Sequence, residues 1–282
     1  MGHKHKETVY HDKLPVGVFD THAHLYDAKM PDLTEVLTRS ADSGVDKILI
    51  PADSLETSVL AVRTAVENNG KAGVSLWAAV GVHPHEASSY NDEVAKGLIS
   101  LIENRKENLI PAIGEIGLDY YYDLSPRDIQ REVFKKQILL AKETDLPFIL
   151  HERDATGDCL EILTAMHKAG ALRSNPGVCH CCSMSWEAAS FLIKMGFYIG
   201  FDGPLTFKNN RRGVELAQNC PLERIVVETD SPYLTPEPNR GKTNEPCFVP
   251  FVVDRLAEIK GCAPEEMAKI TSDNGMALYE LQ

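Results

Sequence analysis

The stretch IPAIGEIGLDYYYDLSPRDIQREVFKKQILLAKETDLPFILHER, residues 110–153, is predicted to fold as a strand, a helix and a second strand. Residues 110–119 and 147–153 are short apolar runs of the kind that favour strands, whereas residues 125–145 form a longer amphipathic segment. This segment opens with serine and proline, which is typical of a helix N-cap followed by the first turn. Two strands joined through a helix indicate a parallel pair with a crossover connection.

The same alternation of short apolar runs and longer amphipathic stretches continues through the chain. Further helices are predicted at 33–44 and 185–196, and both segments end in glycine, as helices often do. The remaining predicted strands are VFDTHAHL (18–25), KILIPAD (47–53), SLWAAVGVHP (75–84), PGVCHCC (176–182), FYIGFDG (197–203) and RIVVETD (224–230). Eight strand–helix units predict an α/β fold, a single-domain (β/α)8 TIM barrel. The alternative is a doubly wound open sheet, but the sequence lacks the glycine fingerprints of nucleotide-binding open sheets.

The chain of 282 residues is long enough for one large barrel domain. We assign residues 17–282 to this barrel, and residues 1–16, which include His3, His5 and His11, to a flexible leader or an expression remnant. The leader lacks the apolar core of a secretory signal, and no run in the sequence approaches about 18 apolar residues. We therefore expect neither secretion nor a membrane span.

Net charge and cysteine content restrict the partners and the compartment. The formal charge is −12, which disfavours broad electrostatic binding to nucleic acid, so a phosphate-bearing substrate would need metal ions or a few local cations. Seven cysteines in a chain without a secretion signal favour free thiols in a reducing cytoplasm. The run CHCC, residues 179–182, lacks the second ligand pair of a structural zinc site, so we assign no cysteine-ligated metal to it.

Ionisable side chains collect at one end of the predicted barrel. In barrel enzymes the catalytic residues come from the C-terminal ends of the strands. At least six of the eight predicted strands carry such groups near this end: Asp20, His22, His24, His83, His85, Glu115, Asp119, His151, Glu152, Arg153, His180 and Asp230. Because alternate residues of a strand face the same side, we expect His22 and His24 to point into the barrel mouth together and to reach one metal ion.

The donor atoms of these side chains are nitrogen and oxygen, a set that suits zinc, manganese, iron or nickel, and magnesium less naturally. Two histidines with two carboxylates would form one site, and two further histidines that share Glu115 would form a second. A bridging carboxylate places two metals about 3.5–4 Å apart, as in two-metal hydrolases, where one ion acidifies a water molecule and the pair neutralises developing charge. The residues therefore predict a hydrolytic site with two divalent metal ions.

Several motifs of the chain resemble those of the TatD family of metal-dependent deoxyribonucleases. They are DTHAHL (20–25), GVHPHE (81–86), IGEIGLDYYYD (113–123), ILHERDA (149–155), HCCSM (180–184), ETDSPYLTP (228–236) and RGKTNEP (240–246), and the resemblance runs from about residue 17 to residue 280. The family commonly has HCFSG where this chain has Cys182 and Met184, and a run of small residues where this chain has YIGFDGPLTFKN (198–209). Both departures lie near the predicted site and concern substrate preference more than catalysis.

The resemblance implies a TIM-barrel hydrolase of the amidohydrolase superfamily that cleaves DNA phosphodiester bonds. His22, His24, Glu115 and Asp230 would hold the first metal, and Glu115, His151 and His180 the second. Asp230 would also accept a proton from the attacking water, and we expect Asp230 and Glu115 to be the catalytic residues. The family implies a 3′-to-5′ exonuclease that favours single-stranded DNA or 3′ ends, with Mg²⁺ or Mn²⁺ for activity and Zn²⁺, Fe²⁺ or Ni²⁺ as alternative bound ions.

Side chains around the predicted site have candidate roles in substrate binding. His83 is expected to hydrogen-bond the substrate or a metal-bound water. Cations at strand ends and in loops are candidates for contacts with the DNA backbone, because they suit phosphate groups: Arg153, Lys208, Arg240 and Lys242. Tyr120, Tyr121 and Tyr122 could stack on bases, and we expect at least one of them to pack on the barrel instead. We expect a monomer that does not bind membranes.

Two other functions remain open. A related barrel metallohydrolase would act on a small ester, amide, lactone or phosphodiester, since the fold and the metal arrangement do not by themselves choose the substrate. The TatD-like motifs and the cations near the barrel mouth favour DNA instead. A non-catalytic metal-binding or scaffold protein is the second alternative, and the presence of every expected ligand argues against it.

Overall fold

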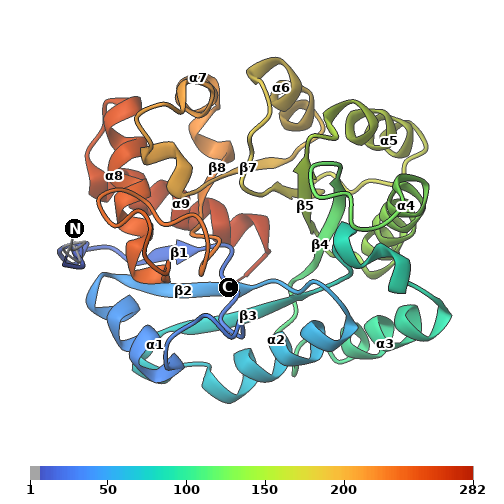
Figure 1. The fold of residues 1–282 in the computed structure, drawn as a ribbon, viewed down its shortest axis with the longest axis horizontal. Coiled ribbons are helices and arrows are strands. Elements are labelled where there is room, and N and C mark those ends of the chain that lie inside the picture. The colour runs from blue at the N-terminus through green and yellow to red at the C-terminus, as the bar shows by residue number, and fades with distance from the viewer. Residues whose placement is uncertain (1–6, 282) are drawn as a thin grey trace, which may run out of the picture.

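The computed structural model of the protein describes residues 7–281 and contains eight parallel strands arranged as a barrel (Figure 1). Each strand pairs with the next one along the chain. The strands are β1 (Val18–Asp20), β2 (Val45–Ile50), β3 (Ser75–Val80), β4 (Ala112–Asp119), β5 (Phe148–Arg153), β6 (Gly177–Cys179), β7 (Tyr198–Phe201) and β8 (Ile225–Val227). This sequential order confirms the predicted (β/α)8 barrel and excludes the doubly wound sheet, whose strand order reverses at a switch point.

Helices follow the strands and surround the barrel (Figure 1). The α-helices are α1 (Leu33–Asp42), α2 (Leu55–Asn68), α3 (Asp92–Glu103), α4 (Arg127–Thr144), α5 (Thr156–Lys168), α6 (Trp186–Lys194), α7 (Arg211–Asn219), α8 (Val249–Lys260) and α9 (Pro264–Leu278). Short 3₁₀ segments are η1 (Lys71–Gly73), η2 (Pro84–Ser89), η3 (Gly203–Thr206), η4 (Leu222–Arg224) and η5 (Pro246–Phe248). Both α8 and α9 follow β8, and α9 packs against β1 and β8. None of the helices among residues 7–281 has the length and apolar character that crossing a membrane requires.

Helix ends follow the local sequence at most positions. Side chains cap the starts of α1, α2, α3, α6 and α7, and Gly44 and Gly196 take positive φ angles of 91° and 101° just after α1 and α6, as predicted. The start of α4 differs, because Pro126 is its N-cap and makes no side-chain hydrogen bond. The predicted cap, Ser125, instead donates its hydroxyl to the carbonyl of His85 at 2.8 Å and so ties α4 to the loop after β3.

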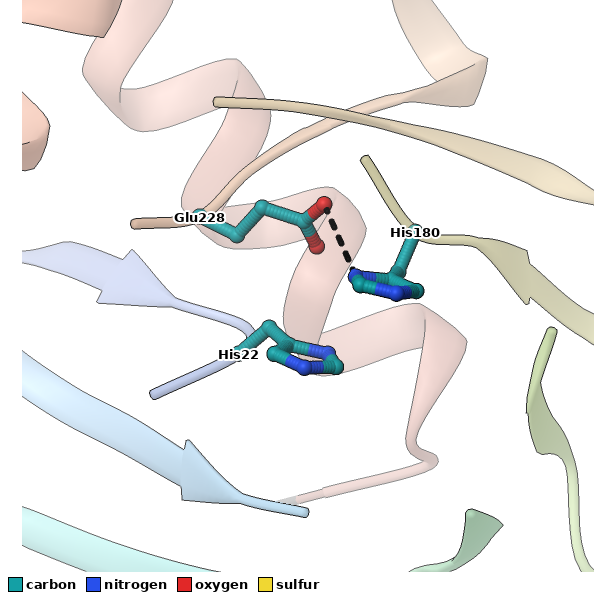
Figure 2. Close-up of side chains that lie close together, drawn as sticks. All are labelled: His22, His180 and Glu228. Atoms are coloured by element: carbon teal, nitrogen blue, oxygen red, sulfur yellow. Dashed lines mark ion pairs between the residues drawn. The ribbon is translucent and has the colours of Figure 1, made fainter. Parts of the chain in front are cut away.

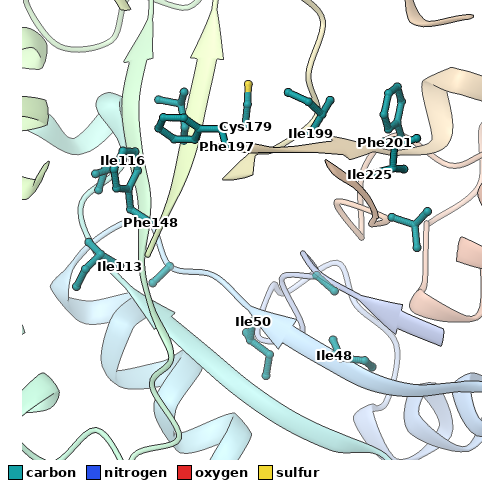
Figure 3. Close-up of a cluster of buried hydrophobic side chains, with 14 of the residues drawn as sticks. Ile48, Ile50, Ile113, Ile116, Phe148, Cys179, Phe197, Ile199, Phe201 and Ile225 are labelled. Atoms are coloured by element: carbon teal, nitrogen blue, oxygen red, sulfur yellow. The ribbon is translucent and has the colours of Figure 1, made fainter. Parts of the chain in front are cut away.

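Two apolar layers hold the barrel together. The inner layer takes one side chain from each strand and is closed by the end of α9: Phe19, Leu49, Ala79, Ala112, Ile149, Val178, Tyr198, Val226, Leu278 and Tyr279. The outer layer is larger and joins the opposite faces of the strands to the helices; Figure 3 shows part of it, including Ile48, Ile113 and Phe148. Because the inner layer fills the barrel, the polar side chains must lie above it, at the C-terminal ends of the strands.

Several strands end earlier than predicted, and this changes the reason why His22 and His24 lie together. β1 ends at Asp20 and β8 at Val227, so both histidines and Asp230 follow the regular strands. The two segments stay paired beyond the strands, because Asp230 N–H donates to the His22 carbonyl at 2.9 Å and His24 N–H to the Ser231 carbonyl at 2.8 Å. These bonds join the first and last strands of the barrel and hold the three side chains at its mouth.

The described part of the predicted leader, residues 7–16, contacts the barrel domain. The Val9 N–H donates to Asn239 Oδ1 at 2.9 Å, and Asn239 Nδ2 donates to the Val9 carbonyl at 2.6 Å. His11 Nε2 lies 2.8 Å from Asp254 Oδ2 on α8, and the His11 ring packs edge-on against Phe251. This part of the leader is therefore bound to the domain, whereas His3 and His5 lie outside the described residues.

Candidate metal centre

Glu115 lies at the centre of the ionisable cluster, on β4, with only 3% of its surface exposed. Its Oε1 is 3.3 Å from Nε2 of both His22 and His24. Its Oε2 is 2.9 Å from His180 Nε2 and 3.5 Å from His151 Nδ1. One buried carboxylate therefore faces four imidazole nitrogens, two on each of its oxygens.

The first donor set contains His22, His24, Glu115 and Asp230. The two histidine Nε2 atoms lie 3.3 Å apart, and Asp230 Oδ1 lies 3.6 and 3.5 Å from them. A tetrahedral metal with bonds of about 2.1 Å holds its ligand atoms about 3.4 Å from one another. The spacing therefore fits a metal ion. His22 Nδ1, the ring nitrogen that does not face this donor set, is buried without a hydrogen-bond partner.

The second donor set contains Glu115 Oε2, His151 Nδ1 and His180 Nε2. The two nitrogens lie 3.2 Å apart, at distances from Glu115 that again fit ligands of one ion. Three protein ligands leave a position for water or substrate, which is the arrangement of catalytic rather than structural metal sites. Because the sets share Glu115, the structure brings together all six side chains that the sequence assigned to metal binding.

In this cluster the carboxyl groups are ionised, whereas two of the buried histidines are neutral. Burial would raise the pKa of Glu115 and of Asp230, but the surrounding histidines outweigh it and lower both. Burial lowers the pKa of His22 to about 4, and the pKa of His83 falls well below its usual value for the same reason, with a further contribution from His151. The carboxylates are thus ionised, and these two rings are neutral and able to bind a metal or accept a hydrogen bond.

Asp119, at the end of β4, orients the second donor set. Its Oδ2 lies 3.0 Å from His151 Nε2 and 3.0 Å from His85 Nε2, so His151 presents Nδ1 to Glu115. Burial would raise the pKa of Asp119, but hydrogen bonds from His151 and His85 lower it. Gly117 makes this approach of β4 to β5 possible, because its φ is 148° and a Cβ there would lie 1.9 Å from the His151 carbonyl oxygen.

Replacing Asp119 by Asn is expected to weaken metal binding by about 10- to 100-fold, because the variant loses the charge that fixes the His151 ring. Competition with a chelator of known affinity measures this change. Asp128→Asn, which alters an exposed aspartate on α4, is the matched control and should keep the affinity of the wild type. Equal affinities of the two variants would show that Asp119 does not support the metal ligands.

Glu228 is a buried carboxyl at the site that the sequence did not identify. Figure 2 shows it beside the His180 ring, which stacks on His22 with ring centres 4.0 Å apart. Glu228 Oε1 lies 3.8 Å from His180 Nδ1 and accepts the Cys181 N–H, and burial raises the Glu228 pKa to about 8. Glu228 precedes Asp230 by two residues in the run RIVVETD, which the sequence predicts as a strand, and this spacing is the signal that could have revealed it.

A cavity of about 500 Å³ adjoins the second donor set, and the four cations that were predicted to contact phosphate line three different hollows. His151, His180 and Asp230 line one part of it, and Arg153, Arg212 and Asp202 are also in its lining. Of the four predicted cations, only Arg153 lines this cavity. Lys208 and Arg240 line a second hollow, and Lys242 lines a third, where it donates to Thr8 Oγ1 at 3.1 Å. Arg212 was missed because no motif distinguishes it from its neighbours.

The tyrosines after β4 differ in exposure, and one of them, Tyr120, packs on the barrel as predicted. Tyr120 is half-buried and donates its hydroxyl to Asp158 at 2.6 Å, so it has a structural role. Tyr121 and Tyr122 are exposed, and the Arg153 guanidinium lies 4.0 Å from the Tyr121 ring centre and 4.9 Å from that of Tyr122. An arginine and two aromatic rings thus form one surface beside the cavity.

Comparison with known proteins agrees with this geometry. A family model described as TatD related DNase matches residues 19–280. The uncharacterized metal-dependent hydrolase YabD of Bacillus subtilis (strain 168) is 41% identical over 268 residues, which cover 94% of this chain and 99% of that protein. The 3′-5′ ssDNA/RNA exonuclease TatD of Rahnella sp. (strain Y9602) is 35% identical over 259 residues, or 89% of this chain and 93% of that protein.

The crystal structure of YJJV, a TatD homologue from Escherichia coli K12, has the same fold. It matches this structure with a TM-score of 0.82 at 29% identity, over 94% of this chain and 98% of that one. The barrel, the histidine–carboxylate cluster and the family match agree along nearly the whole chain. The chain therefore belongs to the TatD-related DNase family, and it is a metal-dependent hydrolase.

Proposed function

We propose that this hydrolase uses two divalent ions to shorten single-stranded DNA from its 3′ end. The observation that carries the proposal is Glu115, whose two oxygens face two separate sets of metal-binding atoms. Such a shared carboxylate is typical of sites that hydrolyse phosphodiesters with a pair of ions. The named activity of the Rahnella relative and the arginine–tyrosine surface support a single-stranded substrate.

In the proposed reaction each set of ligands binds one metal ion. His22, His24, Glu115 and Asp230 would hold the first ion, and Glu115, His151 and His180 the second; Mg²⁺ or Mn²⁺ would support activity. The bound ions would supply Lewis-acid chemistry, by acidifying a water molecule and neutralising charge on the phosphate. Asp230, which lines the cavity, would accept the proton of the attacking water. The water oxygen bonds to phosphorus, the bond from phosphorus to the preceding 3′-oxygen breaks, and solvent protonates that oxygen.

We infer that His83 hydrogen-bonds the substrate in this reaction. It is buried, its ring centre lies 4.3 Å from that of His151, and its ligand atoms group with those of Glu115 and His151. Because burial keeps the ring neutral, one nitrogen can accept a hydrogen bond and the other can donate one. His83 Nδ1 accepts the His85 N–H at 3.1 Å, which leaves Nε2 as the donor.

The proposal is tested with metal-stripped protein and oligonucleotides labelled at the 3′ or the 5′ end. Mg²⁺, Mn²⁺ or Zn²⁺ is added back, and His22→Ala serves as the inactive comparison. Stepwise shortening from the 3′ end that needs metal and is lost in the variant is the expected result. Intact DNA with every metal, in a protein that still binds the ions, would refute the nuclease activity.

Hydrolysis of a small ester, amide, lactone or phosphodiester is the second candidate. The cavity favours it, because a volume of about 500 Å³ lies within the range of small-molecule sites. The net charge of −12 favours it as well, since only local cations would attract a nucleic acid. Rates for esters, amides, lactones and bis-p-nitrophenyl phosphate, measured beside those for oligonucleotides, separate the two candidates.

Replacing Arg212 by Ala is expected to raise KM for an oligonucleotide about tenfold and to leave kcat nearly unchanged, because one charge-assisted contact to a phosphate is lost. Arg211→Ala is the matched control, because Arg211 is also exposed at the start of α7 but does not line the cavity. Initial rates over a range of oligonucleotide concentrations give both constants. The same increase in KM for both variants would indicate a general charge effect rather than a contact at the cavity.

A further inference from the structure

Asp202 is a buried carboxyl that the proposed chemistry does not use. It follows β7, has 6% of its surface exposed and lies in the lining of the cavity beside the metal donors. Among residues 7–281 no lysine or arginine pairs with it, and Oδ2 has no hydrogen-bond partner. Burial raises the pKa of Asp202 to about 7. A hydrogen bond with the Cys181 side chain offsets part of this burial, but Oδ2 stays unpaired, and a buried unpaired oxygen is unfavourable unless a ligand satisfies it.

The walls of the cavity show which part of a substrate would meet Asp202. His151, His180 and Asp230 belong to the donor sets, where the scissile phosphate would bind. Phe201, Leu205 and Leu234 provide apolar surface for a base or a sugar. A terminal nucleotide whose 5′-phosphate lies at the metal donors would therefore place its sugar in this cavity. The hydroxyl of that sugar can donate a hydrogen bond to a carboxyl oxygen.

On the basis of the proposed exonuclease activity, we propose that Asp202 accepts a hydrogen bond from the 3′-hydroxyl of the terminal nucleotide and so selects strands with a free 3′ end. A site built to bind a hydroxyl discriminates against an analogue that lacks it, because its own polar group is then left unpaired. A 3′-phosphate would be excluded more strongly, because its charge is repelled by the ionised form of Asp202 and by the nearby Asp230 carboxylate.

The test compares three oligonucleotides that differ only at the 3′ end, which carries a hydroxyl, a hydrogen or a phosphate. Single-turnover rates with Mn²⁺ are measured for the wild type, Asp202→Asn, Asp202→Ala and the control Asp154→Asn, an exposed aspartate after β5 that does not line the cavity. We expect the wild type and the control to prefer the hydroxyl end over the dideoxy end by about tenfold or more. Discrimination against the 3′-phosphate should be larger still.

The two substitutions of Asp202 should differ in a way that a purely structural role would not produce. Asp202→Asn keeps an oxygen that accepts the hydroxyl but loses the charge, so it should keep part of the preference over the dideoxy end and lose the extra exclusion of the phosphate. Asp202→Ala should lose both preferences. Equal loss of rate on all three ends in both variants would assign Asp202 to folding and overturn the inference.

A binding measurement separates this inference from the exonuclease proposal. Titration calorimetry of the metal-loaded protein compares thymidine 5′-monophosphate with its 3′-deoxy analogue, and tighter binding of the first by about tenfold is expected in the wild type and not in Asp202→Ala. A wild type that shortens all three ends equally would overturn the inference and leave the exonuclease intact. If no oligonucleotide is shortened, the proposed function fails, and equal affinity for the two mononucleotides would overturn the inference as well.

Discussion

Replacing Glu115 by Gln is expected to remove both metal ions and to lower the rate of hydrolysis about 1000-fold or more. Each oxygen of Glu115 faces two imidazole nitrogens at 2.9–3.5 Å, so this one side chain belongs to both donor sets. Glutamine has the same shape, but it lacks the negative charge, and its amide nitrogen cannot bind a metal. The substitution therefore weakens metal binding at both sites, whereas replacing any one histidine would remove a ligand from only one set.

Two measurements check this expectation. The metal content of the purified variant, determined by mass spectrometry after equilibration with Mn²⁺, should fall from two ions per chain to near zero, and single-turnover hydrolysis should fall with it. Glu107→Gln is the control, because Glu107 is an exposed residue that precedes the same strand and contacts neither donor set. A Glu115→Gln protein that keeps two ions would show that the carboxylate is not a shared ligand.

The barrel was predictable because its signal is local and repeated. Each strand is a short apolar run and each crossover a longer amphipathic one, so errors at individual boundaries do not change the topology. The strands that end at Asp20 and Val227 were predicted too far along the chain, because the residues beyond them stay hydrogen-bonded to one another without belonging to the regular strands. A cap can also fail when its side chain has a better partner elsewhere, as Ser125 does at His85.

The candidate metal ligands were accessible from the sequence because they lie at the same end of successive strands and match motifs of a known family. Residues whose position depends on the path of a loop could not be placed from the sequence. Lys242 was expected near phosphate, but its loop folds toward Thr8 instead. Arg212 and Asp202 reach the cavity only because α7 and η3 are placed beside it in three dimensions. No periodicity or spacing in the sequence encodes that placement.

The affinity of the metal-free protein for a divalent ion is expected to rise about 10- to 100-fold for each pH unit between roughly pH 7 and 9. Burial alone would lower the pKa of His180, but the charge of Glu115 and the hydrogen bond to it raise this pKa to about 10. Burial also opposes protonation of His24, but hydrogen bonds to Asp230 and Glu115 raise its pKa well above the usual value. Both rings thus carry protons near neutral pH, and a metal ion must displace one or both.

Raising the pH is expected to increase the affinity for metal but to decrease the stability of the metal-free fold. Raising the pH removes the competing protons, so metal binding strengthens up to the pKa of His180 at about 10. The same raised pKa stabilises the metal-free fold below about pH 6.5, the ordinary pKa of histidine, and this stabilisation is lost as the pH rises through about 10. The metal-free protein should therefore lose thermal stability across this window, while the metal-loaded protein, whose rings are already deprotonated, should not.

Titration calorimetry in buffers of different ionisation enthalpy counts the protons that a metal ion releases, and thermal unfolding at each pH gives the stability of both forms. His167→Ala, which removes an exposed histidine at the end of α5, is the control and should change neither measurement. We expect at least one proton released at neutral pH, since His24 and His180 carry protons there, the pKa of His151 is also raised, and His22 is already neutral. A metal affinity that stays constant between roughly pH 7 and 9, with no proton release, would mean that Glu115 does not hold protonated histidines in the metal-free protein.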